Sequence, residues 1–371
     1  MKKTIATFTV EYQQVMDEEG NVDQSLMPNL TESQIKELYH LMKLARTFDE
    51  KLFLLQRSGK VGTYAQIKGQ EAQVATGYIL QKTDWIAPSF REMGVYIARG
   101  ADRVKIVQGW KGDVRANEDD PKTARSLPVA VPIATQCLHA CGIAWASKLR
   151  GEKDICVTYI GDGGTSEGDF YEALNFAGEL KLGVIIYCQN NQWAISTPRT
   201  KQTAAQTIAQ KAIAAGINCI QIDGNDVIGV YKAMSDAIAR GRNGEGPTLI
   251  EAITFRMGDH TTSDDASKYR DPKLVEEWKN RDPLLRLEKY FKKIGTWSDD
   301  YGKFVVAECE KEAEAAITAA LALPPPSPKN LFAHIYETLT PDLVEEEAEV
   351  LSDVEARKAL AATNSPKTGG A

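Results

Sequence analysis

Carboxylate and carboxamide side chains follow two neighbouring strand patterns in this sequence. Asp162 lies in the stretch from Gly161 to Asp169, directly after one apolar run, and the pair Asn190-Asn191 follows the next apolar run. Their oxygens are hard donors of the kind that Mg2+ takes, and the surrounding glycines let a phosphate approach the backbone. These residues therefore predict a magnesium ion that anchors a cofactor containing a diphosphate.

The glycines of this stretch fit neither of two common nucleotide-binding patterns. A dinucleotide fingerprint needs a third glycine where Ser166 stands. A P-loop needs a lysine where Asp169 stands, and an aspartate there would repel phosphate unless a cation intervened. Either polar motif alone is more often a turn or a cap. One strand–helix–strand crossover brings Asp162 and Asn191 together, however, and this favours the metal site.

Apolar runs and helical patterns alternate along most of the chain. Apolar runs predict buried strands at residues 84–88, 155–160, 184–188, 219–222 and 248–253. Helical spacing predicts a long helix that begins at Thr31 with a capping box and stops before Gly59, and further helices at residues 70–80, 138–149, 170–180, 227–240 and 303–322. The predicted fold class is therefore α/β, with a parallel sheet and helices on both faces. Ligands bind such sheets at the carboxyl ends of the strands, where both motifs lie.

Three segments are expected along the chain. Residues 1–30 form an irregular N-terminal arm, residues 31–323 form the α/β domain, and residues 324–371 form a Pro-rich linker, a C-terminal helix and a frayed tail. Within the domain, residues 256–275 are polar and predict a loop. The α/β core is thus expected to carry a helical extension at its C-terminal end.

The composition indicates a soluble protein with a sizeable core, because 43% of its 371 residues are hydrophobic and 26% are charged. A net charge of −7 argues against binding to nucleic acid. No apolar stretch approaches the roughly 20 residues that span a bilayer, and the short apolar run after Lys3 has no cleavage site, so a cytoplasmic protein is expected. Reduced thiols are expected at all six cysteines, which are Cys137, Cys141, Cys156, Cys188, Cys219 and Cys309.

Several motifs, taken in order along the chain, resemble those of one family. They are Gly69-Gln70-Glu71-Ala72, Phe90-Arg91, the stretches 161–172 and 190–198, Asp223-Gly224-Asn225-Asp226, and the segment from His260 to Arg270. Over roughly residues 20–340 the chain resembles the alpha subunit of the decarboxylating component of 2-oxo acid dehydrogenase complexes, and bacterial enzymes acting on pyruvate most of all. The resemblance implies a thiamin diphosphate-binding fold, with thiamin diphosphate and Mg2+ as cofactors.

The resemblance also implies how the magnesium and the diphosphate are held. Asp162 and Asn191 bind the metal through their side chains, and Trp193 binds it through its backbone carbonyl. Gly163 and Gly164 offer backbone amides to the diphosphate. These assignments agree with the metal site that the residue types alone predict.

Other positions of the resemblance concern the rest of the cofactor and the reaction. Arg91 pairs with diphosphate oxygens. Phe90 stands where many relatives have a tyrosine, so this chain lacks the hydroxyl that such a tyrosine offers to the diphosphate. The backbone at Val131 and Ile133 contacts the aminopyrimidine ring. His260, in the polar loop, is the expected catalytic residue for proton handling and acyl transfer, a task that suits a group with an ordinary pKa of about 6.5.

The resemblance implies that this chain is one part of a larger enzyme. In the family, a glutamate of the beta subunit activates the aminopyrimidine, so this chain is expected to hold the diphosphate end within an α2β2 heterotetramer. A 2-oxo acid is the expected substrate, and a lipoyl acyltransferase core is the expected acceptor. Many bacterial relatives have a histidine between Arg91 and the glycine motif. Residues 110–130 contain none, and Arg115 is the candidate substitute.

Alternatives to a pyruvate enzyme remain at this stage. Residues 131–136 and 262–267 also resemble the branched-chain 2-oxo acid enzyme, whereas residues 194–215 look more like the pyruvate enzyme. Thr135 and Gln136 match part of a potassium site of the branched-chain enzyme, but Ala130 lacks the hydroxyl that this site would use. A non-catalytic subunit that scaffolds a partner is the rival from another class. An NAD-linked dehydrogenase is disfavoured by the missing third glycine.

Overall fold

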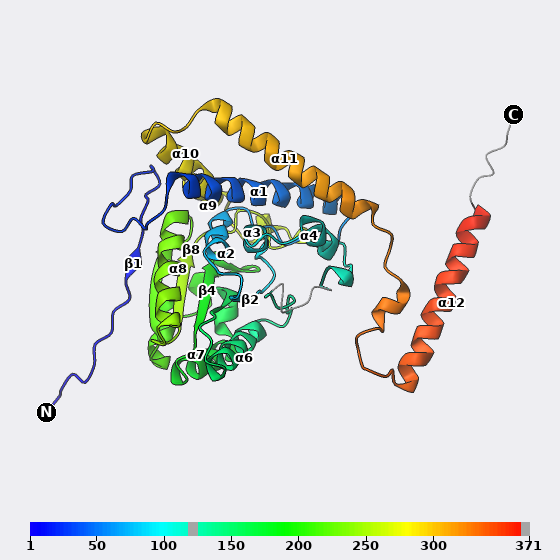
Figure 1. Cartoon of the computed structure of the whole chain (residues 1–371), viewed down its shortest axis with the longest axis horizontal. Helices are drawn as coiled ribbons and strands as arrows, with labels where there is room; N and C mark the ends of the chain where they lie inside the picture. The colour runs from blue at the N-terminus through cyan, green and yellow to red at the C-terminus, as the bar shows by residue number, and fades with distance from the viewer. Residues whose placement is uncertain (118–124, 365–371) are drawn as a thin grey trace.

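A six-stranded parallel sheet forms the centre of the computed structural model, which describes residues 1–117 and 125–364 (Figure 1). The strands lie in the order β1 (Tyr12–Gln13), β7 (Asn218–Asp223), β8 (Thr248–Ile253), β4 (Val184–Asn190), β3 (Cys156–Gly161) and β2 (Trp85–Ala87). β4 is buried along its whole length, as expected for a parallel strand covered on both faces. The predicted α/β fold with a parallel sheet is confirmed.

Helices cover both faces of the sheet because successive side chains on a strand point in opposite directions. On β3, Val157 and Tyr159 join a core with α1 (Glu32–Arg57), α2 (Val74–Tyr78), α3 (Met93–Ala98), α4 (Arg103–Trp110), α8 (Val227–Arg242), α10 (Pro283–Lys293) and α11 (Asp299–Ala322). Cys156 and Ile160 join a second core with α6 (Thr135–Leu149), α7 (Gly168–Glu179) and the 3-10 segment η5 (Ala209–Ala215).

The long helix α1 begins as its sequence predicts. The Thr31 hydroxyl accepts from the backbone N–H of Gln34, and the Gln34 side chain accepts from the backbone N–H of Thr31, so the capping box is present. The helix ends at Arg57, just before Gly59. Its apolar stripe is buried and attaches the helix to the body, with Ile35, Leu38, Met42, Ala45, Phe48 and Leu52 at most 2% exposed.

Most of the N-terminal arm is irregular, as the sequence predicts, but a short part of it joins the sheet. Tyr12 and Gln13 pair with β7 at the edge of the sheet, and Val15 and Met16 are buried. The backbone N–H groups of Val15 and Met16 both donate to Asp226 Oδ2, each at 2.7 Å. A strand of two residues leaves little periodic signal, and its position depends on a carboxylate that lies far away in the sequence.

Two other segments contain shorter elements than the single helix and the single loop that the sequence predicts. Residues 70–80 form a 3-10 turn, η1 (Glu71–Gln73), followed by the short α2. The polar loop contains η6 (Ala266–Lys268) and ends where α9 (Pro272–Lys279) starts. Asp271 caps α9 by accepting from the Lys273 N–H, and a proline at the first helical position suits that start.

The chain ends in a helical extension, as expected. α11 is followed by prolines, a short turn, η7 (Pro328–Leu331), and then α12 (Pro341–Asn364), which stands away from the body (Figure 1). All six cysteines are free. Among the helices of the described ranges, none combines the length and the apolar character that crossing a membrane requires.

Candidate active site

The two predicted metal-binding turns meet at the carboxyl edge of the sheet. β3 and β4 are paired in parallel, with Gly161 opposite Gln189, so Asp162 and Asn191 leave adjacent strands at nearly the same level. Both are buried, at 2% and 6% exposure. The antiparallel hairpin of β5 (Trp193–Ala194) and β6 (Thr197–Pro198) follows Asn191 directly.

The glycines allow the two turns to touch. A Cβ on Gly163 would lie 2.5 Å from Cβ of Ala194, which is far inside van der Waals contact. A Cβ on Gly164 would lie 2.7 Å from Cγ1 of Ile160 and 3.1 Å from Cγ2 of Ile133. The glycine turn therefore packs against the hairpin on one side and against Ile133 on the other. Any residue with a side chain would push these segments apart, so glycine is required at both positions.

Asp162 is a buried carboxylate that would gain from a cation. Burial raises its pKa to about 6, although the Gln202 amide donates to Oδ2 at 2.8 Å and Arg256 and Arg199 favour the charged form. A divalent ion would stabilise the carboxylate that burial penalises. The donor chemistry therefore fits the magnesium ion that the resemblance implies.

Asn191 and Trp193 present oxygens beside this carboxylate turn. The Trp193 N–H donates to Asn191 Oδ1 at 3.3 Å, and Asn191 Nδ2 donates to Gln70 Oε1 at 3.1 Å. The Trp193 carbonyl accepts from Arg256 at 3.4 Å. Left-handed backbone at Gln192 and Ile195, with φ of 72° and 53°, bends the chain around this carbonyl.

Arg91 and His260 form a second group beside the two predicted metal-binding turns. The Arg91 guanidinium is 6% exposed and donates to the backbone carbonyls of Gln66 at 2.6 Å and His260 at 2.7 Å. Burial, with the nearby Arg256 charge, lowers the pKa of Arg91 to about 10. The Phe90 ring meets the His260 imidazole edge-on, with 6.1 Å between the ring centroids, and it offers no hydroxyl for a hydrogen bond.

The surroundings of His260 define its tautomer. Its Nδ1 faces Arg91 at 3.0 Å and Arg256 at 3.4 Å, and a guanidinium can only donate. Nδ1 must therefore accept, which leaves the proton of the neutral ring on Nε2. Burial and the two arginines lower the pKa of His260 to about 4. At neutral pH the ring can donate a hydrogen bond from Nε2.

Sequence reasoning missed Arg256, which the structure brings into this group. Its side chain is fully buried and donates to the Ile195 carbonyl and to the Tyr269 hydroxyl, each at 2.8 Å, while its Nε has no partner. The available signal was topological. Arg256 follows β8, which pairs with β4, so its strand ends at the same edge as Asn191. A buried cation at that edge suits an anionic ligand.

The remaining predicted positions are more exposed or lie apart. Val131 is 77% exposed, and Ile133 is 44% exposed although it reaches Gly164. Arg115 pairs with Asp113 at 2.6 Å and donates to the Pro324 carbonyl at 2.8 Å. Gln136 donates to the Tyr159 carbonyl at 2.8 Å. Residues 118–124, which belong to the segment 110–130 that lacks the histidine, lie outside the described ranges.

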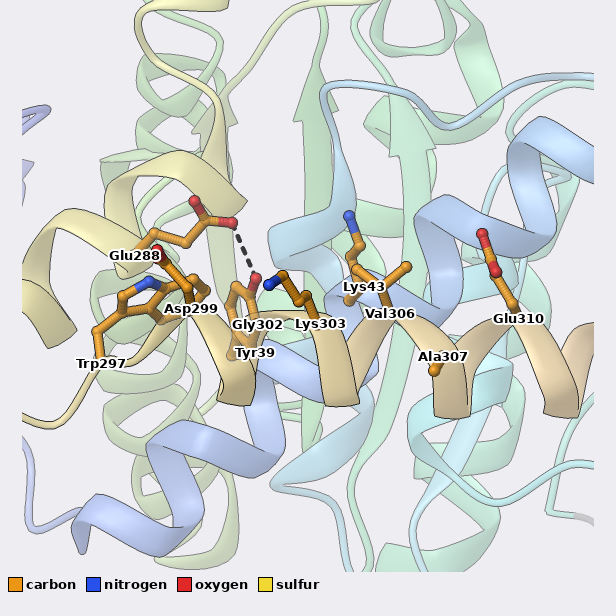
Figure 2. A pocket seen from close by; sticks show the side chains of 10 residues that line it. All are labelled: Tyr39, Lys43, Glu288, Trp297, Asp299, Gly302, Lys303, Val306, Ala307 and Glu310. Atoms are coloured by element: carbon orange, nitrogen blue, oxygen red, sulfur yellow. Dashed lines mark hydrogen bonds between the residues drawn. The ribbon is translucent and has the colours of Figure 1, made fainter.

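A surface hollow of about 480 Å3 lies elsewhere on the body, between α1 and α11 (Figure 2). Tyr39, Glu288 and Trp297 are among its lining residues, and the Tyr39 hydroxyl donates to Glu288 at 2.8 Å. None of the predicted site residues lines it. The chemistry argued above therefore belongs to the sheet edge and not to this hollow.

Comparison with known proteins identifies the family. The family model described as "Dehydrogenase E1 component" matches residues 39–329. The pyruvate dehydrogenase E1 component subunit alpha of Bacillus subtilis (strain 168) is 41% identical over 93% of each chain, and that of Staphylococcus aureus (strain Mu50 / ATCC 700699) is 41% identical over 91% of each. The 3-methyl-2-oxobutanoate dehydrogenase subunit alpha of Mycobacterium tuberculosis (strain CDC 1551 / Oshkosh) is also 41% identical, over 85% of this chain and 86% of its own. The chain therefore belongs to the dehydrogenase E1 component family, as an alpha subunit of a 2-oxo acid dehydrogenase.

Proposed function

We propose that this chain binds Mg2+ and thiamin diphosphate and, together with a beta subunit, decarboxylates pyruvate and passes the acetyl group to a lipoyl group. The observation that carries the proposal is the meeting of Asp162, Asn191 and the Trp193 carbonyl at one sheet edge, beside two buried arginines. When bound, the cofactor supplies the carbon nucleophile and the electron sink for loss of carbon dioxide. The protein supplies position, charge and protons.

The metal and the diphosphate divide the site residues between them. Asp162, Asn191 and the backbone of Trp193 would hold the metal, and the remaining positions of an octahedral Mg2+ suit phosphate and water oxygens. Gly163 and Gly164 would offer their amides to the diphosphate. Arg91 and Arg256 would neutralise its charge, which relieves the repulsion between two buried guanidinium groups.

His260 holds a proton where the reaction needs one. Because Nδ1 accepts from arginine, the ring presents Nε2–H at neutral pH. We propose that this N–H donates to an oxygen of the substrate or of the transferred acyl group, and that His260 is the catalytic residue of this chain. Its catalytic role thus requires a neutral ring that acts as a donor.

The proposed partners are a beta subunit, in an α2β2 assembly, and a lipoyl acyltransferase core. The relatives are named as alpha subunits of an E1 component, which supports a second subunit and a larger complex. Val131, Ile133 and Ile195 leave apolar surface exposed beside the metal turns, at 77%, 44% and 56%. A partner that carries the other half of the cofactor site would cover such a surface.

Pyruvate is the proposed substrate, and the branched-chain acid is the second candidate. The relatives from Bacillus subtilis and Staphylococcus aureus carry pyruvate in their names, whereas a relative of equal identity is named for 3-methyl-2-oxobutanoate. Steady-state rates of the reconstituted tetramer on the two acids decide between them. A higher kcat/KM for pyruvate is expected, and a clear preference for the branched acid would reverse the assignment.

The metal assignment is tested with Asp162→Ala in the assembled enzyme. We expect the variant to lose Mg2+-dependent binding of thiamin diphosphate, measured by titration calorimetry, together with decarboxylation. Asp154→Ala is the control, because Asp154 precedes the same strand at its opposite end. A purely scaffolding subunit would leave cofactor binding and decarboxylation intact in both variants.

A further inference from the structure

We propose that Gln70 is a positioning residue that sets which atom of Asn191 faces the magnesium ion. The inference rests on the proposed function and assigns a role to the Gly69-Gln70-Glu71 motif. A carboxamide ends in one oxygen and one nitrogen, and only the oxygen binds Mg2+. Asn191 Nδ2 donates to Gln70 Oε1 at 3.1 Å, so the nitrogen is held away from the metal position.

The other atom of the carboxamide is fixed as well. Asn191 Oδ1 accepts from the Trp193 N–H at 3.3 Å, so a backbone donor holds the oxygen end of the amide. Reversing the amide would place its NH2 group against that N–H and would bring two donors together. Gln70 and Trp193 thus hold opposite ends of one amide, and the metal oxygen is selected before the ion arrives.

The backbone of Gln70 is fixed on both sides. Its own N–H donates to the Ile67 carbonyl at 2.8 Å, and its carbonyl accepts from Gln73 Nε2 at 3.0 Å. The preceding Gly69 has a φ of +90°, and a Cβ there would lie 2.5 Å from the Phe255 carbonyl oxygen. The Gly69 carbonyl also accepts from the Thr254 hydroxyl at 2.6 Å. The turn is therefore locked against the segment that continues β8.

The orientation of the Gln70 side chain is unusual for a buried amide. Gln70 is 1% exposed, and its Nε2 has no hydrogen-bond partner. A buried donor without a partner is unfavourable, so packing alone would not select this arrangement. Gln70 can orient the Asn191 amide only by presenting its own oxygen to Asn191 Nδ2. This requirement explains why Gln70 Nε2 is left without a partner.

A double-mutant cycle tests this role in the assembled tetramer. Gln70→Met removes the acceptor with little change of volume. We expect it to weaken the Mg2+ affinity roughly 10- to 100-fold, as the loss of a residue that orients a metal ligand typically does.

Asn191→Asp replaces the amide by a carboxylate whose two ends are both oxygens, so no orientation remains to be set. In that background Gln70→Met is expected to change the Mg2+ affinity less than about 3-fold. Affinity is read by tryptophan fluorescence during Mg2+ titration with saturating thiamin diphosphate, without substrate.

Two further variants keep the test decisive. Gln108→Met is the matched control, because Gln108 is a buried glutamine of α4 that donates to Asp113. We expect the Mg2+ affinity of this variant to match wild type. Gln70→Glu retains an oxygen that accepts from Asn191, so we expect affinity at least equal to wild type. Should Gln70→Met fail to fold, a loss in Gln70→Glu that exceeds 10-fold would by itself overturn the role.

The outcomes separate this inference from the proposed function. If wild type shows no Mg2+-dependent cofactor binding, the proposed function fails before Gln70 is tested. If wild type binds but Gln70→Met matches Gln108→Met, Gln70 does not position the ligand. An equal loss from Gln70→Met with and without Asn191→Asp would show a general packing defect and would also reject the role. A loss confined to the protein that retains Asn191 supports it.

Discussion

Two arginine side chains lie buried beside His260 at the sheet edge. Arg91 and Arg256 bind backbone carbonyls, and neither forms an ion pair within the described ranges. Burial first, and the nearby Arg256 charge second, lower the pKa of Arg91 to about 10. Nearby carboxylates such as Glu92 and Asp264 offset part of this charge, but among the described residues none of them pairs directly with either guanidinium. Buried cations of this kind are typical of a site that takes an anion. The residues therefore favour a diphosphate over a neutral ligand.

Two alanine substitutions of glycines in the stretch from Gly161 to Asp169 are expected to differ in their effects. Gly163→Ala would place a methyl group 2.5 Å from Ala194 Cβ and must push the hairpin away, so we expect a loss of about 1–3 kcal/mol in stability and weaker Mg2+-dependent cofactor binding. Gly168→Ala, in the same stretch, meets nothing within 4 Å and is expected to bind like wild type. Calorimetric titration of both tetramers checks this, and equal cofactor affinities would contradict the packing argument.

Elements followed from the sequence where local pattern determines them. The central strands are mostly apolar runs, and α1 carries its own capping box, so both were predictable. β1 was not, because two residues carry no period and Asp226 positions them. The site divides in the same way. Asp162 and Asn191 stand at strand ends, whereas the roles of Arg256 and Gln70 depend on contacts with segments far away in the chain.

Helix α1 supports the site through one buried carboxylate. Asp49 Oδ1 accepts from the Tyr64 hydroxyl at 2.6 Å and from the Ile67 N–H at 2.7 Å. Between them, the Gln66 carbonyl receives Arg91. Tyr64 also pairs through its backbone with Thr262, two residues beyond His260. One carboxylate thus connects the long helix to both the arginine and the histidine.

The pH dependence of Asp49 is predictable in sign. Burial raises its pKa from 3.8 to about 7, so its contribution to stability is present below about pH 4 and is lost as pH rises through 7. Asp49→Asn keeps the acceptor oxygen and cannot ionise. At pH 8 we expect the variant to be more stable than wild type by up to about 4 kcal/mol, with the gap closing towards pH 4.

Urea midpoints of both proteins, at one concentration and at pH 4.5 and 8, measure this gap. Glu92 also has a pKa raised to about 7 by burial, but it titrates in both proteins, so the difference between them isolates Asp49. A gap that stays constant between the two pH values would show that Asp49 is already ionised in the folded protein.

At the scale of the whole molecule, α6 and α7 leave an apolar face uncovered. The exposed large hydrophobic side chains on these two helices are Leu138, Trp145, Leu149, Tyr171 and Phe176. The Trp145 and Phe176 rings meet edge-on at 5.5 Å, so the two helices share one surface. The face continues towards Ile133, which touches Gly164 in the glycine turn. An uncovered apolar surface that runs into the proposed cofactor site suits contact with the proposed beta subunit.

We therefore expect Trp145→Glu to weaken assembly with the beta subunit. A charge at the centre of an apolar interface removes an aromatic anchor worth about 2 kcal/mol or more, which corresponds to roughly 30-fold in the dissociation constant.

Phe304→Glu is the control, because Phe304 is 61% exposed on α11, away from the cofactor site. Analytical ultracentrifugation of the mixed subunits gives the dissociation constants. If the two substitutions weakened assembly equally, or if only Phe304→Glu did so, the partner would have to approach from another face. Loss of assembly with Trp145→Glu should also make cofactor binding depend on protein concentration, because each subunit would then hold only part of the site.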